Sequence, residues 1–183
     1  MPPKLDTQLE GRILKAAQQL WHTRGEHGLT LRAIAREAGT STPTVYKRFR
    51  NKEAILFALS ESFRDRLNET LFGAANIEEV FARYVQYAED NPQEYQLLWR
   101  SWMSALGSDR PRPGYLWFIS QLAQRFGGSP DDYAQAFYAF FLLAHGTASL
   151  LTVPGVELAH NDVRRNFLSI CDVLIKNIQV LRV

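Results

Sequence analysis

A short polar segment near the N-terminus carries side chains of the types that read double-stranded DNA. Within residues 42–49, helical spacing places Val45 and Phe49 on one side. The opposite side then carries short hydroxyl groups that can meet base edges or thymine methyl groups, and long cations that can reach phosphate or guanine. The residues of this outer face are Thr42, Pro43, Thr44, Tyr46, Lys47 and Arg48.

Further polar side chains flank this segment at positions suited to phosphate binding. Thr30 and Ser41 each precede a predicted helix, and Lys52 follows Asn51 at the start of another, where free backbone N–H groups favour an anion. Arg32 lies two residues beyond Thr30. Each assignment has an alternative, since Arg32 and Lys47 could be ordinary solvated charges and Tyr46 could pack between helices. The predicted DNA-binding set is Thr30, Arg32, Ser41, Thr42, Pro43, Thr44, Tyr46, Lys47, Arg48 and Lys52.

Two short helices separated by a tight turn would hold these side chains in place. Thr30 is a predicted N-cap for a helix over residues 31–38, and Gly39 ends it where a left-handed conformation is easiest. Ser41 caps the next helix, over residues 42–49, and Pro43 sits in its first turn, where a missing N–H costs nothing. This order predicts a helix-turn-helix whose second helix enters the major groove.

Helical spacing of apolar residues recurs along the rest of the chain, which predicts an all-α fold of about nine helices. We expect a DNA-binding head over residues 1–55 and a helical body over residues 56–183, with the helix 51–72 bridging the two. The expected helices are 6–23, 31–38, 42–49, 51–72, 77–90, 93–106, 115–126, 131–151 and 161–181.

Residues 12–63 resemble the N-terminal domain of the tetracycline-repressor (TetR) family. The matching residues are 13–17, 28–32, 34–35, 38–39, 44–46, Phe49 and 51–56, which together cover under a third of the chain. Pro43 stands where such regulators often have a small residue, and Lys47 and Arg48 make the segment more basic than usual. The resemblance implies a DNA-binding regulator, but the departures mean that its operator cannot be borrowed from a relative.

The last two predicted helices are candidates for a dimer interface. One short recognition helix reads only a few base pairs, whereas a two-fold dimer places two such helices about 34–36 Å apart. The alternative is that both helices are internal core helices. The predicted interface residues are Phe137, Phe140, Val163, Phe167, Ile170, Leu174 and Ile178.

Aromatic residues are concentrated in the expected body, where they could line an apolar cavity for a small effector or form ordinary core. The family resemblance favours a pocket and implies an apolar or aromatic effector. Residues 137–146, followed by Leu150 and Leu151, are also similar to one TetR subgroup with a His-Gly pair, so His145 is either a ligand-facing group or a core histidine. The candidate ligand-binding residues are Tyr84, Tyr87, Tyr95, Trp99, Trp102, Met103, Trp117, Phe118, Phe141 and His145.

Composition and charge exclude other classes of protein. Residues 1–66 contain 12 Lys and Arg against 7 Asp and Glu, a balance of +5, and residues 67–183 contain 9 against 12, a balance of −3. This asymmetry suggests a polyanionic partner for the head. Neither a metal site nor a cofactor is indicated, because the four histidines are dispersed and Cys171 is the only cysteine.

No catalytic constellation is readable, and the longest apolar run, residues 136–144, is far shorter than the ~20 residues that span a bilayer. We therefore expect a cytoplasmic, non-enzymatic homodimer that represses a palindromic operator until a small molecule binds. The alternatives are a transcriptional activator, or a helix-turn-helix regulator controlled by a protein partner.

Overall fold

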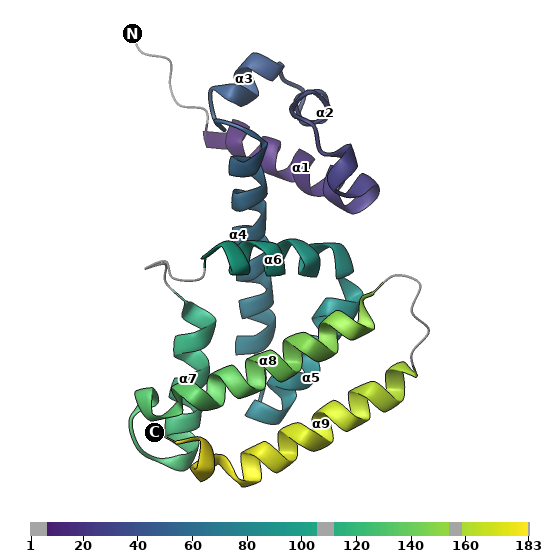
Figure 1. The fold of residues 1–183 in the computed structure, drawn as a ribbon. Coiled ribbons are helices and arrows are strands. Elements are labelled where there is room, and N and C mark those ends of the chain that lie inside the picture. The colour runs from purple at the N-terminus through teal and green to yellow at the C-terminus, as the bar shows by residue number, and fades with distance from the viewer. Residues whose placement is uncertain (1–6, 106–111, 154–158, 183) are drawn as a thin grey trace. The chain divides into compact units, whose positions relative to one another are not determined.

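The computed structural model describes residues 7–105, 112–153 and 159–182, and over these residues the chain is all-α. The structure thus confirms the expected fold class, with nine α-helices and two 3-10 helices in the described part (Figure 1). The elements are α1 (Thr7–Gly28), α2 (Leu31–Glu37), α3 (Thr42–Tyr46), α4 (Lys52–Phe72), α5 (Ile77–Asp90), α6 (Pro92–Ala105), α7 (Pro113–Phe126), η1 (Pro130–Tyr133), α8 (Ala134–Leu151), α9 (His160–Lys176) and η2 (Ile178–Leu181).

Helix boundaries differ from the expected ones where local backbone geometry intervenes. The expected break after Thr23 is a kink rather than an end, because Gly25 has a φ of 60° and one further turn follows to Gly28. The last helix ends at Lys176, and residues 178–181 continue as the 3-10 helix η2. The recognition helix α3 is shorter than expected and ends at Tyr46.

Contacts divide the chain into two compact units. We call residues 1–64 with 93–106 the head unit, and residues 65–92 with 107–183 the body unit. The expected boundary after residue 55 therefore differs from the division in the structure, since the head also holds the next turns of α4 and all but the first residue of α6.

The head unit has its own apolar core, into which every helix of the unit contributes. Ile13, Ala17 and Leu20 come from α1, and the short helices α2 and α3 add their inner faces. α4 and α6 complete the core. The fully buried apolar side chains of α2, α3 and α4 are Ile34, Val45, Ile55, Leu59 and Phe63.

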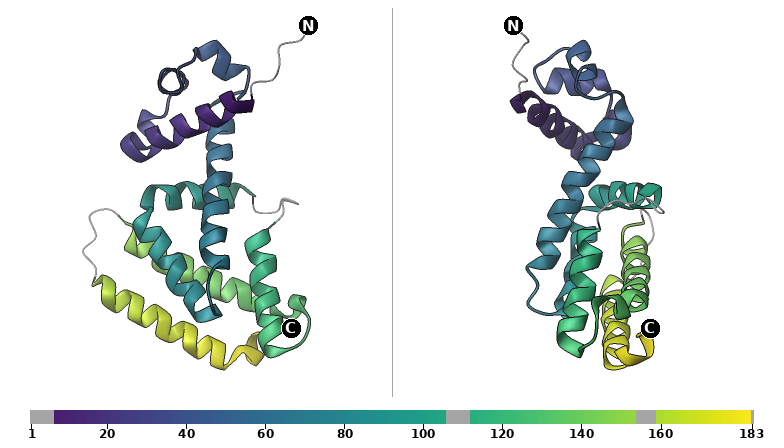
Figure 2. Two further views of the ribbon diagram at one scale, coloured as in Figure 1. Left: turned by 180° about the vertical axis from the view of Figure 1, so that it is seen from behind. Right: turned by 90° about the vertical axis from the view of Figure 1, so that its left-hand side faces the viewer.

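The body unit is built around α5, which packs against both α8 and α9 (Figure 1, Figure 2). Phe81 of α5 is central: its ring lies 4.7 Å from Phe140 of α8 and 6.2 Å from Phe167 of α9, measured between centroids. Phe118 of α7 closes the cluster at 6.0 Å from Phe81.

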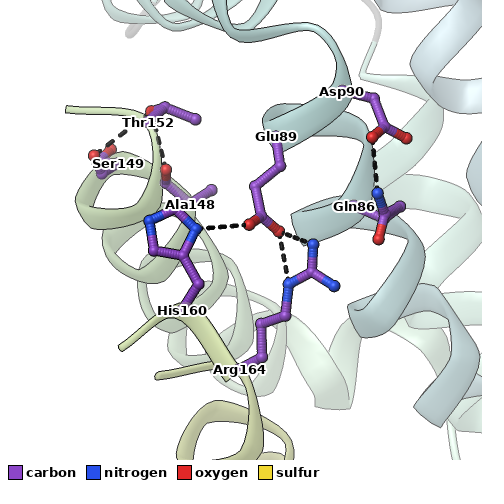
Figure 3. A network of polar contacts seen from close by, with 8 residues as sticks. All are labelled: Gln86, Glu89, Asp90, Ala148, Ser149, Thr152, His160 and Arg164. Atoms are coloured by element: carbon purple, nitrogen blue, oxygen red, sulfur yellow. Dashed lines mark hydrogen bonds and ion pairs between the residues drawn. The ribbon is translucent and has the colours of Figure 1, made fainter. Parts of the chain in front are cut away.

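A polar network ties the start of α9 to the end of α5 (Figure 3). Glu89 accepts from Arg164 Nε at 2.6 Å and lies 3.2 Å from His160 Nδ1. Its side chain is only 13% exposed, so the carboxylate requires such partners. The network fixes which turn of α9 faces α5.

One helical segment, Pro130–Leu151, is long and apolar enough to cross a bilayer by length and composition, with a mean hydropathy of 1.3 over an 18-residue window. Core helices of globular proteins share these properties, and α8 within this segment packs against α5, α7 and α9. Only 33% of the window is buried, so α8 leaves much of its apolar surface uncovered.

Candidate nucleic-acid interface

The turn between α2 and α3 is held by backbone and side-chain caps. Thr30 Oγ1 accepts from the N–H of Ala33 at 3.1 Å and so begins α2. After α2, Gly39 adopts a φ of 63°, and the N–H of Thr40 bonds to the carbonyl of Ala35 at 2.8 Å. This is the left-handed exit predicted from the glycine.

The recognition helix α3 is capped at its start and anchored along its inner side. Ser41 Oγ accepts from the N–H of Thr44 at 3.3 Å and lies 2.7 Å from Thr44 Oγ1, and Pro43 occupies the first turn. Val45 is 0% exposed and Phe49 6%. These anchors leave the polar residues of α3 facing solvent.

The outer face of α3 is accessible in the way that base and phosphate contacts require. Tyr46 is 55% exposed, so it does not pack half-buried between helices. Pro43 and Lys47 are also exposed, whereas Thr42, Thr44 and Arg48 are half-buried.

The predicted phosphate-binding residues around α3 lie at helix starts. Thr30, Arg32 and Ser41 are exposed, and Asn51 Oδ1 caps α4 by accepting from Ala54 N–H at 2.9 Å. Lys52 differs from the others because its Nζ donates to the carbonyl of Glu26 at 3.2 Å and lies 3.9 Å from a Glu26 carboxylate oxygen. The sequence analysis missed this neighbour, since Glu26 is 26 residues away.

The helix α6 is bound to α1 by polar contacts that were also missed. Trp21 Nε1 donates to the carbonyl of Gln93 at 3.1 Å, and His22 Nε2 lies 2.6 Å from Glu94, whose side chain is 1% exposed. Further along, Arg100 Nη1 donates to Glu26 at 2.8 Å. These contacts explain why α6 clusters with the head.

The structure separates the predicted dimer residues into core and surface. Phe140, Phe167 and Ile178 are 2%, 3% and 2% exposed within the body's own core, so they do not reach a surface. Phe137, Val163 and Leu174 are half-buried, and Ile170 is 47% exposed. Sequence spacing had left unmarked the exposed apolar residues of α8 and α9, which are Tyr138, Leu142, Leu150, Leu168 and Val173.

The predicted ligand-binding residues also divide. Tyr87, Tyr95, Phe118 and His145 are buried; Tyr84, Trp99, Trp102, Trp117 and Phe141 are half-buried; the side chain of Met103 lies outside the described residues. Trp99 and Trp102 stack on each other at 5.3 Å on α6 of the head unit. Phe137, Phe141 and His145 form a stacked row along α8 of the body unit, with centroid separations of 5.6 and 6.1 Å.

His145 is held in a dry environment. Its Nε2 lies 3.2 Å from Ser149 Oγ, and burial lowers the pKa of the imidazole from 6.5 to about 4. The ring is therefore neutral at neutral pH and able both to donate and to accept a hydrogen bond. That property suits a core histidine and a ligand-facing one equally.

A cavity of about 550 Å³ lies among α4, α5 and α9 of the body unit. Tyr87 is the one predicted ligand-binding residue that lines it. Arg83 there donates to Glu79 at 3.0 Å and to the carbonyl of Thr70 at 2.7 Å, and Arg164 pairs with Glu89. These cations are satisfied within the protein.

The head unit thus has the geometry of a helix-turn-helix DNA-binding domain. Residues 13–59 match the family model of the bacterial regulatory proteins of the tetR family. A curated relative, the class A tetracycline repressor protein of transposon 1721 from Escherichia coli, is 42% identical over 50 residues, which are 27% of this chain and 23% of that protein.

Solved structures extend the likeness over nearly the whole chain. A variant of TetR from Acinetobacter baumannii in complex with minocycline has a TM-score of 0.69 at 19% identity, covering 95% of this chain and 98% of its own. A TetR from Streptomyces coelicolor has a TM-score of 0.63 at 20% identity, covering 93% and 97%. The chain has the fold of these regulators, and within its head residues 13–59 match the tetR family model.

Proposed function

We propose that this protein is a homodimeric transcriptional repressor that leaves a palindromic operator when a small molecule binds its body. The observation that carries the proposal is α3: a short helix pinned from inside by Val45 and Phe49, with Tyr46 and Lys47 exposed on its outer side. Because Tyr46 and Lys47 are exposed and not packed in the head core, this outer side suits a major groove.

DNA affinity should come chiefly from phosphate contacts around α3. Thr30, Arg32 and Lys52 surround the recognition helix in the basic part of the chain, and Tyr46 adds a hydroxyl donor. Thr42 and Thr44 are short enough to approach base edges, so they are the proposed readers of sequence. Binding of this kind weakens steeply with salt.

The uncovered apolar face of α8 and α9 supports the dimer. Tyr138, Leu142 and Leu150 follow one another on α8 in steps of four and eight residues, and Leu142 and Leu150 are 60% and 55% exposed. On α9, Ile170 and Val173 are 47% and 55% exposed. A second copy of the same face would cover these side chains, and its two-fold symmetry would match a palindromic operator.

An effector site in the body is proposed from the family relationship together with the half-buried aromatic side chains. The stacked row of Phe137, Phe141 and His145 offers apolar rings and one neutral imidazole, which suits an apolar or aromatic molecule. Effector binding would shift the population of dimers towards a conformation in which the separation of the two heads no longer matches adjacent major grooves.

Operator binding is tested with DNA from the region upstream of the protein's own gene. The wild-type protein should bind this duplex selectively, with an affinity that falls as salt rises. Lys47→Gln should weaken binding and reduce the salt slope by about 1 per half-site. Lys176→Gln is the matched control, because Lys176 lies on α9 and is paired with Asp172 at 2.6 Å. Equal effects of the two changes would contradict the proposed interface.

The effector is tested separately by thermal unfolding. A true effector raises the melting temperature by mass action and should release the operator at the same concentrations. A molecule that stabilises the protein and strengthens DNA binding would contradict release. A library in which no molecule does either would favour control by a protein partner.

A further inference from the structure

The Glu26 carboxylate stands between two cations that come from different parts of the head unit. Arg100 of α6 donates to one carboxylate oxygen at 2.8 Å. Lys52, at the start of α4, lies 3.9 Å from the other oxygen and also donates to the Glu26 carbonyl at 3.2 Å. All three side chains are partly exposed, at 46% for Glu26, 50% for Arg100 and 32% for Lys52.

We infer that Glu26 is a positioning residue through which Arg100 sets how much of the Lys52 charge is available to a DNA phosphate. The inference rests on the proposed function, because it requires Lys52 to contact DNA. In this proposal Glu26 and Arg100 affect DNA binding through Lys52 and not by contacting the operator themselves.

The physical basis is competition for one carboxylate. The hydrogen bond from Arg100 lowers the pKa of Glu26 below its ordinary value of 4.5, so the group is ionised at neutral pH. With Arg100 in place, the closer ion pair takes one oxygen, and Lys52 keeps only the longer contact. Without Arg100, the whole carboxylate can turn to Lys52 and compete with phosphate for its ammonium group.

Arg100 is placed by α6, whose other end is anchored on α1. Gln93 and Glu94 at the start of α6 bind Trp21 and His22, one turn before Glu26 in the sequence. Ser101, next to Arg100, accepts from Ser60 Oγ of α4 at 2.8 Å.

The experiment compares Arg100→Gln, Glu26→Gln, Lys52→Gln and the paired combinations with the wild-type protein. The probe is a fluorescent duplex that the wild-type protein selects from a random pool, titrated at 50 to 200 mM salt. One phosphate contact weakens binding about 3.5-fold over a fourfold rise in salt. Arg100→Gln should therefore bind more weakly at low salt and lose about 3.5-fold less affinity per half-site over this range.

The combinations distinguish positioning from direct contact. Glu26→Gln should bind somewhat more tightly than the wild-type protein, because it removes the longer contact to Lys52. Arg100→Gln with Glu26→Gln should bind as tightly as Glu26→Gln alone, because the competing carboxylate is gone. In the Lys52→Gln background, neither Arg100→Gln nor Glu26→Gln should have any effect. The inference is overturned if the Arg100–Glu26 double variant stays as weak as Arg100→Gln, or if Glu26→Gln still tightens binding without Lys52.

Arg125 and Glu78 provide a matched control pair in the body unit. They are also 2.8 Å apart and are 43% and 42% exposed, so Arg125→Gln and Glu78→Gln remove the same charges from an equivalent ion pair. Neither change should alter the slope. If the wild-type protein itself selects no sequence and shows no salt dependence, the proposed function fails, whereas a binding wild type with unaltered variants refutes only the role of Glu26.

Discussion

Gly146 allows the proposed dimer face to be tested by the sign of one substitution. It is exposed in the interior of α8, between Leu142 and Leu150, and a Cβ there would meet no atom within 4 Å in the same subunit. Replacing a helical glycine with alanine stabilises by about 1 kcal/mol when nothing obstructs the methyl group. Gly146→Ala should therefore raise the free energy of unfolding of the isolated subunit by about 1 kcal/mol.

In the dimer the same methyl group should be unfavourable. A glycine on this apolar stripe lets the partner helix approach closely, and an added methyl group in such a packed interface costs about 1–3 kcal/mol. Two-fold symmetry introduces the methyl group twice. Because about 1.4 kcal/mol corresponds to a tenfold change, the dimer dissociation constant should rise at least about tenfold.

Sedimentation equilibrium measures the dissociation constant, and urea unfolding at low and high protein concentration separates the two effects. Gly11→Ala is the control, since Gly11 lies on α1 of the head and its Cβ would also meet no atom within 4 Å. The control should gain stability with an unaltered dissociation constant. If Gly146→Ala behaves like Gly11→Ala, the close approach of two α8 helices is refuted.

Three further predictions concern single residues. Gly39→Ala should lower the free energy of unfolding in urea by about 1–2 kcal/mol, because Gly39 has a φ of 63° with open space around it, so that only backbone strain is added. Gly39→Asn should lower it less, and an unaltered stability of the alanine variant would contradict the strain. Burial raises the pKa of the Cys171 thiol to about 12, so a thiol reagent at pH 8 should react only after unfolding, and rapid reaction of the native protein would contradict the core placement. Folding lowers the pKa of His145 from its ordinary 6.5 to about 4, so the contribution of His145 to stability is present above pH 6.5 and is lost as the pH falls towards 4. The stability of His145→Gln should therefore change less with pH across this window. Identical profiles of the variant and the wild type would place His145 in contact with water.

The helix-turn-helix could be predicted closely because its signals are local. Thr30, Gly39 and Ser41 act on backbone groups within five residues of themselves, so their types and spacing specify the caps and the turn. The inner side chains Val45 and Phe49 follow directly from helical periodicity. The all-α fold could be predicted for the same reason.

The placement of α6 and the surface of α8 could not be predicted in this way. The contact between His22 and Glu94 joins residues 72 positions apart, and a charged pair of this kind leaves no periodic signal. α8 is apolar nearly all round, so spacing alone could not tell the buried Phe140 from the exposed Leu142. The packing of α5, α7 and α9 against α8 decides which face remains open.

The membership of α6 in the head unit also has a consequence for synthesis of the chain. The ribosome synthesises α5 before α6, so the head remains incomplete after α5 has already left the ribosome. At that stage α8 and α9 are not yet present to cover Phe81 and Val85 of α5. A fragment cut after residue 64 to isolate the DNA-binding part would likewise lack α6, leaving His22 without Glu94 and Glu26 without Arg100. A fragment meant to bind DNA in isolation should therefore retain residues 93–106.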